Sequence, residues 1–502
     1  MEKFVLAIDQ GTTGSTVALV NERGSIAFKV NFEFEQIFPK PGWVEHNPEH
    51  IWQSVLKGIE DVFKKSNIKP QQLVSIGITN QRETVVGWDE RDLSPVYNAI
   101  VWQCRRTTDL CQKLKTKGLE KIIKNKTGLV LDPYFSGTKM HWILKNSEKA
   151  KNSAKQKTLR FGNIDTYLVA RLTNGESYKT DVSNASRTLL MNLKNGAWDR
   201  ELLELFGVKK EMLPEICCSN ARYGKTKGVP GLPDGIPICG IAGDQQAALF
   251  GQACFSPGEA KCTFGTGSFI LLNTGNVPVK TKSGVLTTVA WQLEGQKELT
   301  YALEGGAFIC GAAVQWLRDG LLFFKSSAEV ESLARQAEDT GGVEFVPALT
   351  GLGAPYWNPN ARGMWLGLTR GTTKAQMARA TLEAMALQNA DILVAMEKDF
   401  GKKLKKLRVD GGASANNLLM QMQANYLGQN VIRPKMIETT ALGAAFLAGI
   451  GVGLWANMDE VKKVWAMDKE FEKSYTNDQR KKRLAKWQNA IKTVNYYSKF
   501  SN

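Results

Sequence analysis

Two short segments that combine glycine with threonine have the composition of an anion-binding loop. The first, Gly11-Thr12-Thr13-Gly14, follows the apolar run Phe4–Ile8, and the second, Gly265-Thr266-Gly267, follows the strand pattern at 260–264. Glycines let backbone N–H groups turn toward an anion, and threonine hydroxyls add donors without bulk. The first loop lacks the spacing of a P-loop or a dinucleotide-binding fingerprint, so an ordinary hairpin tip is its alternative. Two such loops facing one another would bind a triphosphate from both sides.

Asp9 and a third glycine cluster complete the residues that could handle a nucleotide. Asp9 stands at a strand end, where a carboxylate can hold a divalent cation directly or through water, although it could instead cap its own turn. The cluster GGASANN at 411–417 follows a short strand and runs into a helical pattern. Its small residues would let a flat ring lie on the backbone beside a helix start, which favours an adenine and ribose site over a simple tight turn.

The elements that position these residues repeat along the chain. Two units of strand, glycine-threonine loop and strand lie about 255 residues apart, which indicates two similarly built halves. Strands alternate with helical tracts, and this favours an α/β fold with helices packed over sheets. Turn residues at 251–258 indicate a boundary. We therefore expect an N-terminal domain at 1–253, a C-terminal domain at 254–455 and an amphipathic helical extension at 456–502.

Three apolar segments should form buried helices. Ala375–Met396 carries two apolar stripes, which indicates a helix buried on most sides. Ala441–Trp455 is too short and too rich in glycine to span a bilayer, so a buried helix and a glycine-rich bend are favoured. An Asn-Asp cap at 477–478 should start a tail helix with a basic outer face, which docks on the protein or, as the alternative, lies on a membrane surface. Its docking residues would be Leu484, Trp487, Ile491 and Val494.

Composition excludes several classes of protein. The 502 residues include 65 Lys and Arg against 49 Asp and Glu, a net charge of +16, and 43 % are hydrophobic, which is typical of a globular chain. Because the basic residues are spread along the chain, a solvated surface that attracts small anions is favoured over nucleic-acid binding. The eight cysteines lack metal-binding spacing, so we expect free thiols without zinc or disulfides. We expect a cytoplasmic protein without a membrane-inserted segment.

A series of motifs in order carries a resemblance to a known family. The motifs are DQGTTGST at 9–16, PGWVEH at 41–46, GITNQRET at 77–84, NAIVWQCRRT at 98–107, DPYFSGTKMHW at 132–142, GIAGDQQAALFGQ at 240–252, FGTGSF at 264–269, GLGAPYW at 351–357 and RVDGGASANN at 408–417. Over roughly residues 1–455 the chain resembles the ATPases of the actin, hexokinase and Hsp70 superfamily, and within it the FGGY carbohydrate kinases. The resemblance implies two actin-like (ribonuclease H-like) domains, each a mixed sheet flanked by helices, with the active-site cleft between them.

The resemblance is strongest to family members that phosphorylate glycerol. It implies ATP-dependent formation of sn-glycerol 3-phosphate, with ATP and Mg²⁺ as cofactors, ADP as the other product and a homodimer as the assembly. The implied glycerol-binding residues are Arg82, Glu83, Trp102, Tyr134, Asp244, Gln245 and Phe269. Arg82 brings rigid donors and Glu83 brings acceptors, which suits neighbouring hydroxyls. Without the family, an Arg-Glu pair in a loop would more often be an exposed ion pair, and Trp102 a core residue.

The resemblance also assigns the chemical step and the nucleotide contacts. Asp244 is the implied general base, because it ends an apolar strand and would take the proton of a terminal hydroxyl as that oxygen attacks the γ-phosphorus in line. Mg²⁺ and the threonines would balance charge on the transferred group, and closure of the two halves would exclude water. The implied nucleotide residues are Thr12, Thr13, Gly14, Thr266, Gly311, Gln315, Gly412 and Asn416, with Asp9 at the metal.

Two departures and two alternatives accompany the resemblance. Thr16 stands where many family members have an arginine, which removes one phosphate contact. Gly235 stands where some relatives have an arginine that helps to bind fructose bisphosphate, so we expect weak or absent regulation of that kind. One alternative is a kinase of the same family for another polyol or a pentulose. The other is a nucleotide-gated binding protein that uses the fold without phosphorylating a small molecule.

Overall fold

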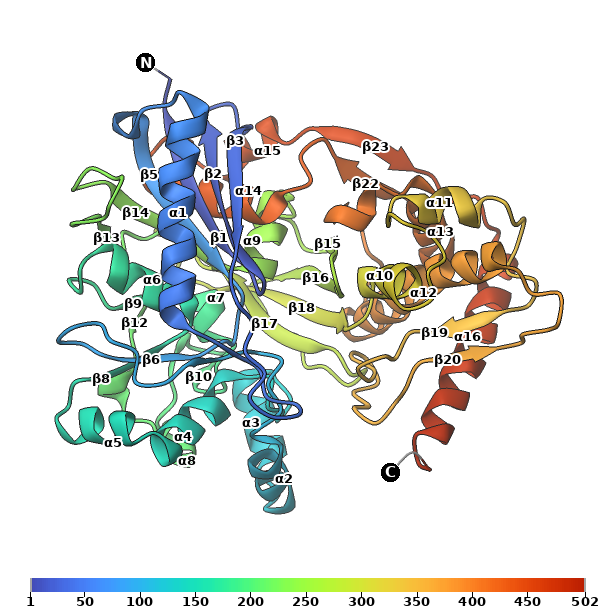
Figure 1. The fold of residues 1–502 in the computed structure, drawn as a ribbon, viewed down its shortest axis with the longest axis horizontal. Coiled ribbons are helices and arrows are strands. Elements are labelled where there is room, and N and C mark those ends of the chain that lie inside the picture. The colour runs from blue at the N-terminus through green and yellow to red at the C-terminus, as the bar shows by residue number, and fades with distance from the viewer. Residues whose placement is uncertain (1, 501–502) are drawn as a thin grey trace.

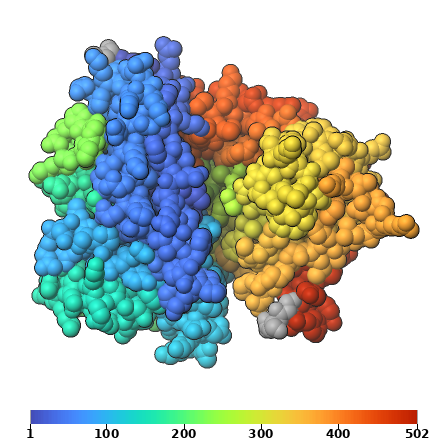
Figure 2. Space-filling view, in the orientation of Figure 1, coloured from blue at the N-terminus to red at the C-terminus, as the bar shows by residue number. Residues whose placement is uncertain are grey.

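The computed structural model describes residues 2–500, which form two lobes separated by a groove. In Figure 1 the first lobe lies on the left, mostly in blue to green, with the orange-red helices α14 and α15 beside its strands, and the second lobe lies on the right in yellow to red. Figure 2 shows the groove between the blue and the yellow surfaces. Among the described residues, no helix is long and apolar enough to cross a bilayer. All eight cysteines are free thiols, as expected.

Each lobe is built on one mixed sheet. The first sheet runs in the order β13 (Gly224–Lys225), β14 (Pro237–Gly243), β5 (Leu73–Asn80), β1 (Phe4–Gln10), β2 (Gly14–Asn21) and β3 (Ile26–Glu33). The second runs in the order β17 (Leu286–Trp291), β18 (Thr300–Ala307), β16 (Ser268–Gly275), β15 (Glu259–Phe264), β21 (Lys406–Asp410), β22 (Val431–Pro434) and β23 (Met467–Phe471).

The two sheets share one topology. In the first, the hairpin β1–β2 has a parallel strand, β5, on the other side of β1. In the second, the hairpin β15–β16 has a parallel strand, β21, on the other side of β15. Each glycine-threonine loop joins the two strands of its hairpin. The prediction of an α/β fold with two similarly built halves, each a mixed sheet flanked by helices, is therefore confirmed.

Short two-stranded pairs extend the lobes away from the central sheets. They are β4 (Glu45–His46) with β7 (Ala99–Ile100), β6 (Val86–Asp89) with β8 (Leu159–Gly162), β9 (Lys179–Asp181) with β12 (Glu215–Cys217), β10 (Met191–Asn192) with β11 (Ala197–Trp198), and β19 (Glu344–Val346) with β20 (Met364–Leu366). Three 3₁₀ turns lie at Pro70–Gln72, Lys210–Met212 and Gly412–Ala415.

Helices cover both faces of the sheets, as the alternating pattern predicts. The helices before the second glycine-threonine loop are α1 (Pro48–Ser66), α2 (Thr108–Thr116), α3 (Glu120–Thr127), α4 (Ser136–Asn146), α5 (Glu148–Lys155), α6 (Ile164–Leu172), α7 (Val182–Ala185), α8 (Arg200–Phe206) and α9 (Asp244–Gly251). Those after it are α10 (Gly311–Asp319), α11 (Glu329–Ala334), α12 (Lys374–Phe400), α13 (Asn417–Leu427), α14 (Thr439–Gly451), α15 (Met458–Val464) and α16 (Asn477–Tyr497).

Helix α14 returns from the second half of the sequence to the first sheet. It packs on β1, β5, β14 and helix α9. Glycines in the strands allow this close approach, because a Cβ at Gly77 would lie 2.3 Å from the carbonyl oxygen of Ala444, and one at Gly240 would lie 2.3 Å from the nitrogen of Ala448. The apolar cluster around α14 includes residues of both lobes. The segment predicted to be a buried helix is therefore part of the contact between the lobes.

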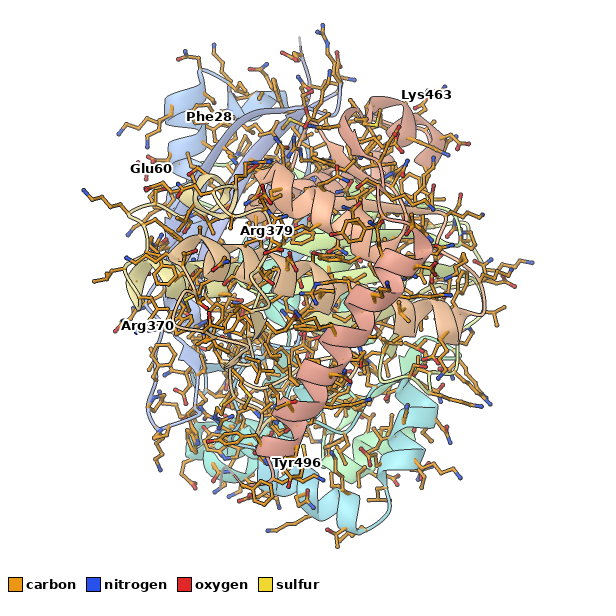
Figure 3. The ribbon with its side chains drawn as sticks, turned by 90° about the vertical axis from the view of Figure 1, so that its right-hand side faces the viewer. Phe28, Glu60, Arg370, Arg379, Lys463 and Tyr496 are labelled. Atoms are coloured by element: carbon orange, nitrogen blue, oxygen red, sulfur yellow. The ribbon has the colours of Figure 1, made fainter. Side chains whose placement is uncertain are left out.

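The tail helix α16 docks on the second lobe. Figure 3 shows it crossing the outer face of that lobe, with Tyr496 near its C-terminal end. Trp487, Ile491 and Val494 are buried there, so the apolar face that a membrane-surface helix would need is already covered by protein. The expected Asn-Asp cap is wrong, because Thr476 caps the helix through the backbone N–H of Gln479.

Helix α12 is largely buried, as its two apolar stripes predict, and it runs on to Phe400. Val394 lies within the segment predicted to be buried on most sides, and its expected place in one of the two apolar stripes is wrong, because it is 40 % exposed. Val394 is exposed because this side of α12 turns away from the core toward the C-terminal end of the helix.

Candidate active site

The carboxyl ends of three neighbouring strands bring the polar residues of the first lobe together. Strand β5 is parallel to both β1 and β14, which flank it. Asp9 lies near the end of β1, Arg82 follows β5, and Asp244 follows β14 as the first residue of α9. Because the carboxyl ends of parallel strands open at one edge of a sheet, residues from distant parts of the sequence meet there.

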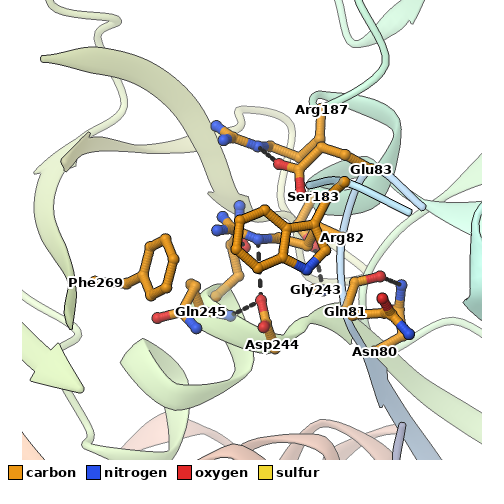
Figure 4. Close-up of polar contacts among 12 residues, drawn as sticks. Asn80, Gln81, Arg82, Glu83, Ser183, Arg187, Gly243, Asp244, Gln245 and Phe269 are labelled. Atoms are coloured by element: carbon orange, nitrogen blue, oxygen red, sulfur yellow. Dashed lines mark hydrogen bonds and ion pairs between the residues drawn. The ribbon is translucent and has the colours of Figure 1, made fainter. Parts of the chain in front are cut away.

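Arg82 lies at the centre of a buried ion network that draws on both lobes (Figure 4). Its Nε lies 3.0 Å from Oδ1 of Asp244, and its two terminal nitrogens donate to both carboxylate oxygens of Glu304 at 2.7 and 2.9 Å. Glu304 belongs to β18 of the second lobe. Arg187 donates to Glu83 at 2.6 Å and to Glu304 at 3.1 Å. Two arginines thus balance two glutamates, and Asp244 is a fifth charge beside them.

This network leaves donors without acceptors. Arg82, Glu83, Arg187 and Glu304 are at most 3 % exposed. Burial opposes the charge of Glu304, but the two guanidinium groups hold the pKa of that carboxyl below its usual value. Arg82 Nε and Arg187 Nη1 have no hydrogen-bond acceptor within residues 2–500. Arg82 Nε still has its ion pair with Asp244, so Arg187 Nη1 is the buried donor that points to a polar ligand, because buried donors nearly always find a partner.

Backbone strain marks the same place. Glu83 has a φ of 61°, a left-handed conformation that is rare for a residue with a side chain. Such strain costs on the order of 1–3 kcal/mol and persists only where the surroundings enforce it. The salt bridge to Arg187 is one of the contacts that hold Glu83 in this position.

Three aromatic rings form a wall beside the network. Trp102 makes edge-to-face contacts with Tyr134 and Phe269, with ring centroids 5.5 and 6.2 Å apart. Phe269 comes from β16 of the second lobe, so the wall also draws on both halves. The indole nitrogen of Trp102 donates to the hydroxyl of Thr12 at 3.0 Å. The wall is therefore connected to the first glycine-threonine loop.

The first glycine-threonine loop is a tight turn held by side chains from elsewhere in the first lobe. The backbone N–H of Gly11 donates to the carbonyl of Gly14 at 2.9 Å. Gln36 donates to the carbonyl of Thr12 at 3.0 Å, and its own amide oxygen is bonded to His46 at 2.7 Å. The carbonyls of the loop are thus engaged by the protein, while the side chain of Thr13 is exposed.

The second glycine-threonine loop opens into a cavity of about 460 Å³ within the second lobe. Five residues predicted to contact the nucleotide line it, namely Thr266, Gly311, Gln315, Gly412 and Asn416. Asn416 also caps α13, because its side-chain oxygen accepts from the backbone N–H of Leu419 at 2.9 Å. The helix-start alternative and the binding-site prediction therefore both apply to this residue. Thr12, Thr13, Gly14 and Asp9 belong to the first lobe and do not line this cavity.

Asp9 is the residue that could hold a divalent cation. Burial, and then the neighbouring Asp244 carboxylate, raise the pKa of Asp9 to about 7. A cation would remove the repulsion between these two carboxylates. Carboxylate oxygens are also the ligands that Mg²⁺ prefers. The described residues contain no group of three or more His, Cys, Asp or Glu side chains arranged for a metal. A Mg²⁺ ion here would fit if phosphate oxygens and water completed its coordination.

Three buried charges in or beside the site were missed by sequence reasoning. They are Arg187, Lys261 and Glu304, which are at most 2 % exposed. Lys261 and Glu304 lie inside strands whose other residues are largely apolar, in AKCTF and YALEGGA. A charge within a buried strand is costly without a partner, so this pattern was a usable signal.

The two departures from the family pattern lie outside this network. Thr16 lies on β2 and donates to the side-chain oxygen of Asn31 at 3.1 Å. Gly235 lies in a turn with a φ of 90°, and its backbone N–H donates to the carbonyl of Thr226 at 2.8 Å. The expected effects of both on nucleotide contact and on regulation stay predictions.

Comparisons with known proteins match the chain over nearly its whole length. The model of the FGGY family of carbohydrate kinases, N-terminal domain, matches residues 4–251, and the C-terminal domain model matches residues 260–452. A glycerol kinase of Bdellovibrio bacteriovorus is 60 % identical over 98 % of this chain and 100 % of its own. The crystal structure of Plasmodium falciparum glycerol kinase with ADP superposes with a TM-score of 0.91 at 36 % identity, covering 98 % of each chain. A ligand-bound xylulose kinase of Lactobacillus acidophilus gives 0.86 at 26 % identity, covering 99 % of this chain and 97 % of its own.

Proposed function

The chain belongs to the FGGY family of carbohydrate kinases, and on this basis we propose that it transfers the γ-phosphoryl group of ATP to glycerol, forming sn-glycerol 3-phosphate and ADP. The observation that carries the proposal is the buried polar set around Arg82, whose charges and unpartnered Arg187 Nη1 suit a small polyhydroxy acceptor. The cavity of about 460 Å³ beside the second glycine-threonine loop suits a nucleotide. The glycerol kinase that is 60 % identical supports glycerol as the acceptor, and the similar glycerol kinase structure with ADP supports an adenine nucleotide.

The acceptor is bound by donors and acceptors whose roles are set by their protein partners. The Oε1 atom of Glu83 accepts from Arg187, so Oε2 is the atom that Glu83 offers to a hydroxyl. Arg82 lies beside the base, with its Nε 3.0 Å from Oδ1 of Asp244, and there it would contact an acceptor hydroxyl. The hydroxyl of Tyr134 and the amide of Gln245 complete the polar contacts. The wall of Trp102, Tyr134 and Phe269 covers the carbon chain.

Asp244 removes the proton of the attacking hydroxyl. Its Oδ1 accepts the backbone N–H of Gln245 at 2.7 Å and lies beside Arg82, so we assign Oδ2 to the proton. As the O–H bond of the acceptor breaks, a bond to the γ-phosphorus forms and the bond from that phosphorus to the leaving ADP oxygen breaks. The transition state is loose, so orientation and charge balance contribute more than covalent chemistry.

Charge on the transferred group is balanced by residues of both loops. Thr12 and Thr13 from the first lobe and Thr266 from the second offer hydroxyls, and the glycines beside them expose backbone N–H groups. Mg²⁺ bound through Asp9 would supply positive charge to the phosphate oxygens. Closure of the lobes excludes water, which would otherwise compete with the acceptor.

A coupled assay of ADP release with a choice of acceptors tests the proposal. We expect release that requires glycerol, with a kcat/KM for glycerol above those for erythritol and xylulose. A higher kcat/KM for xylulose would favour the pentulose alternative, which the 26 % identical xylulose kinase keeps open. Release that ignores all three acceptors and responds to peptides would favour the non-kinase alternative. Detection of sn-glycerol 3-phosphate in the same mixture identifies the product.

Two further features belong to the proposal. The free thiols fit a reducing compartment that also supplies ATP, which supports the cytoplasm. The homodimer implied by the resemblance predicts a light-scattering mass near twice 55.5 kDa, and a mass near 55.5 kDa would contradict it.

A further inference from the structure

A lysine ammonium lies fully buried behind the acceptor site. Lys261 is in β15 and is 0 % exposed. Its Nζ donates to the side-chain oxygen of Gln245, to the hydroxyl of Thr263 at 2.8 Å and to the carbonyl of Phe269 at 3.3 Å. An ammonium has three donors, and each has an acceptor here. Because an unpaired buried charge is costly, these contacts account for its stability in the interior.

Two of these partners belong to the acceptor site. Gln245 directly follows Asp244, and Phe269 contributes its ring to the aromatic wall. Figure 4 draws Gln245 and Phe269 on the same side of Asp244. Lys261 therefore reaches the site from behind, through an amide of the first lobe and a backbone carbonyl of the second. Lys261 has no free donor left for an acceptor hydroxyl.

Lys261 determines which group of the Gln245 side-chain amide, the oxygen or the NH₂, is available to a ligand. A glutamine amide has one oxygen acceptor and an NH₂ donor, and an ammonium can bond only to the oxygen. With Oε1 engaged by Lys261, the group left to a ligand is Nε2, which has no partner in the part of the chain that the structure describes. A rotated amide would place two donors against each other.

We propose that Lys261 is a positioning residue that holds Gln245 as a hydrogen-bond donor toward an acceptor hydroxyl. This proposal rests on the proposed function, because it assumes that the acceptor is a polyol bound beside Gln245. It goes beyond that function by assigning a role in acceptor recognition to a residue that touches no ligand. Burial lowers the pKa of Lys261, while the carboxylates of Asp410 and Asp244 favour its charged form.

A double-mutant cycle in the full-length enzyme tests the role. Lys261→Met keeps most of the side-chain volume and removes the ammonium, and we expect KM for glycerol to rise by about tenfold with a smaller change in kcat. Gln245→Leu should cause a similar rise. In the Gln245→Leu background, Lys261→Met should add less than about twofold, because its effect acts through the amide. Lys406→Met, which removes an exposed lysine of the neighbouring strand β21, is the matched control and should leave KM unchanged.

Gln245→Glu separates positioning from folding. It keeps an acceptor for Lys261 but removes the Nε2 donor, so KM for glycerol should rise as in Gln245→Leu while the melting temperature stays at or above that of the wild type. If Lys261→Met does not fold, an unchanged KM for glycerol in Gln245→Glu would still overturn the proposal. A wild-type KM in Gln245→Glu or in Lys261→Met, or independent effects in the double variant, would overturn the proposal. A wild-type enzyme without glycerol-dependent ADP release would instead overturn the proposed function.

Discussion

The proposed acceptor site and the proposed nucleotide cavity are built from different kinds of residue. Around the acceptor site, Arg82, Glu83, Arg187 and Glu304 are buried charges that bond to one another. The nucleotide cavity is lined largely by glycine, alanine and apolar side chains, together with a few polar residues. In the proposed function, the first region recognises its ligand through side-chain atoms that are already fixed. The second region provides space and backbone groups.

Because their compositions differ, the two regions should tolerate different kinds of substitution. A buried charge network is sensitive to the loss of one charge, because its partners are then left buried and unpaired. A cavity of small residues is sensitive to the gain of atoms. Loss of a charged group should therefore impair the acceptor site most, and an added methyl group should impair the nucleotide cavity most.

Removal of one charge from the acceptor network should have the largest effect. Glu304→Gln leaves Arg82 and Arg187 with one carboxylate fewer, and we expect kcat/KM for glycerol to fall by at least about a hundredfold and the free energy of unfolding by about 3 kcal/mol. Steady-state kinetics and denaturant unfolding measure the two effects. The control removes an exposed ion pair, because Arg200→Ala should change neither quantity measurably. A Glu304→Gln enzyme with wild-type kcat/KM would contradict the claim that the acceptor site depends on each of its buried charges.

Addition of one methyl group should affect the nucleotide cavity. A Cβ at Gly412 would meet no atom within 4 Å, so Gly412→Ala should fold normally and place its methyl in the cavity. We expect KM for ATP to rise by about tenfold, with KM for glycerol and the melting temperature unchanged.

Gly311→Ala is the matched variant for this prediction. Its Cβ would lie 2.7 Å from the carbonyl oxygen of Gly265, so the melting temperature should fall as well. An unchanged KM for ATP in Gly412→Ala would contradict the assignment of the cavity to the nucleotide.

The support of the first glycine-threonine loop should depend weakly on pH. Burial lowers the pKa of His46 to about 4, below its usual value near 6.5, so the folded protein binds fewer protons than the unfolded chain between these values. The contribution of His46 to stability is therefore complete above about pH 6.5 and falls by about 1 kcal/mol between pH 7.5 and 5.5, while the raised pKa of Asp9 acts in the opposite direction. Denaturant unfolding of the wild type and of His46→Gln at both pH values measures the contribution of His46 as the difference between the two proteins. A difference that does not change with pH would exclude His46 as a source of pH dependence.

Local patterns predicted the hairpins, the loops and the buried helices, because strand, turn and helix preferences act over a few residues. The two glycine-threonine loops and the segment that became α14 were visible in this way. The return of α14 to the first sheet was not, since it depends on close contacts of Gly77 and Gly240 with residues more than 200 positions away. Such contacts leave no local periodicity.

The acceptor site was predictable in part for the same reason. Arg82 and Glu83 stand in a motif, but their partners Arg187 and Glu304 come from separate elements and meet them only after the lobes are formed. Lys261 and Glu304 were visible as charges in apolar strands, without an indication of which partner each would find. The choice of Thr476 over Asn477 as the helix cap was a local decision between two suitable residues.

The central claim is that Asp244 takes the proton of the attacking hydroxyl, and single-turnover kinetics of Asp244→Asn test it most directly. The amide keeps an oxygen that can accept from the backbone of Gln245 and lie beside Arg82, but it cannot act as a base. We predict that phosphoryl transfer at saturating glycerol and ATP slows by a factor on the order of 10² or more, while ADP affinity stays unchanged. A transfer rate close to that of the wild type would contradict the account.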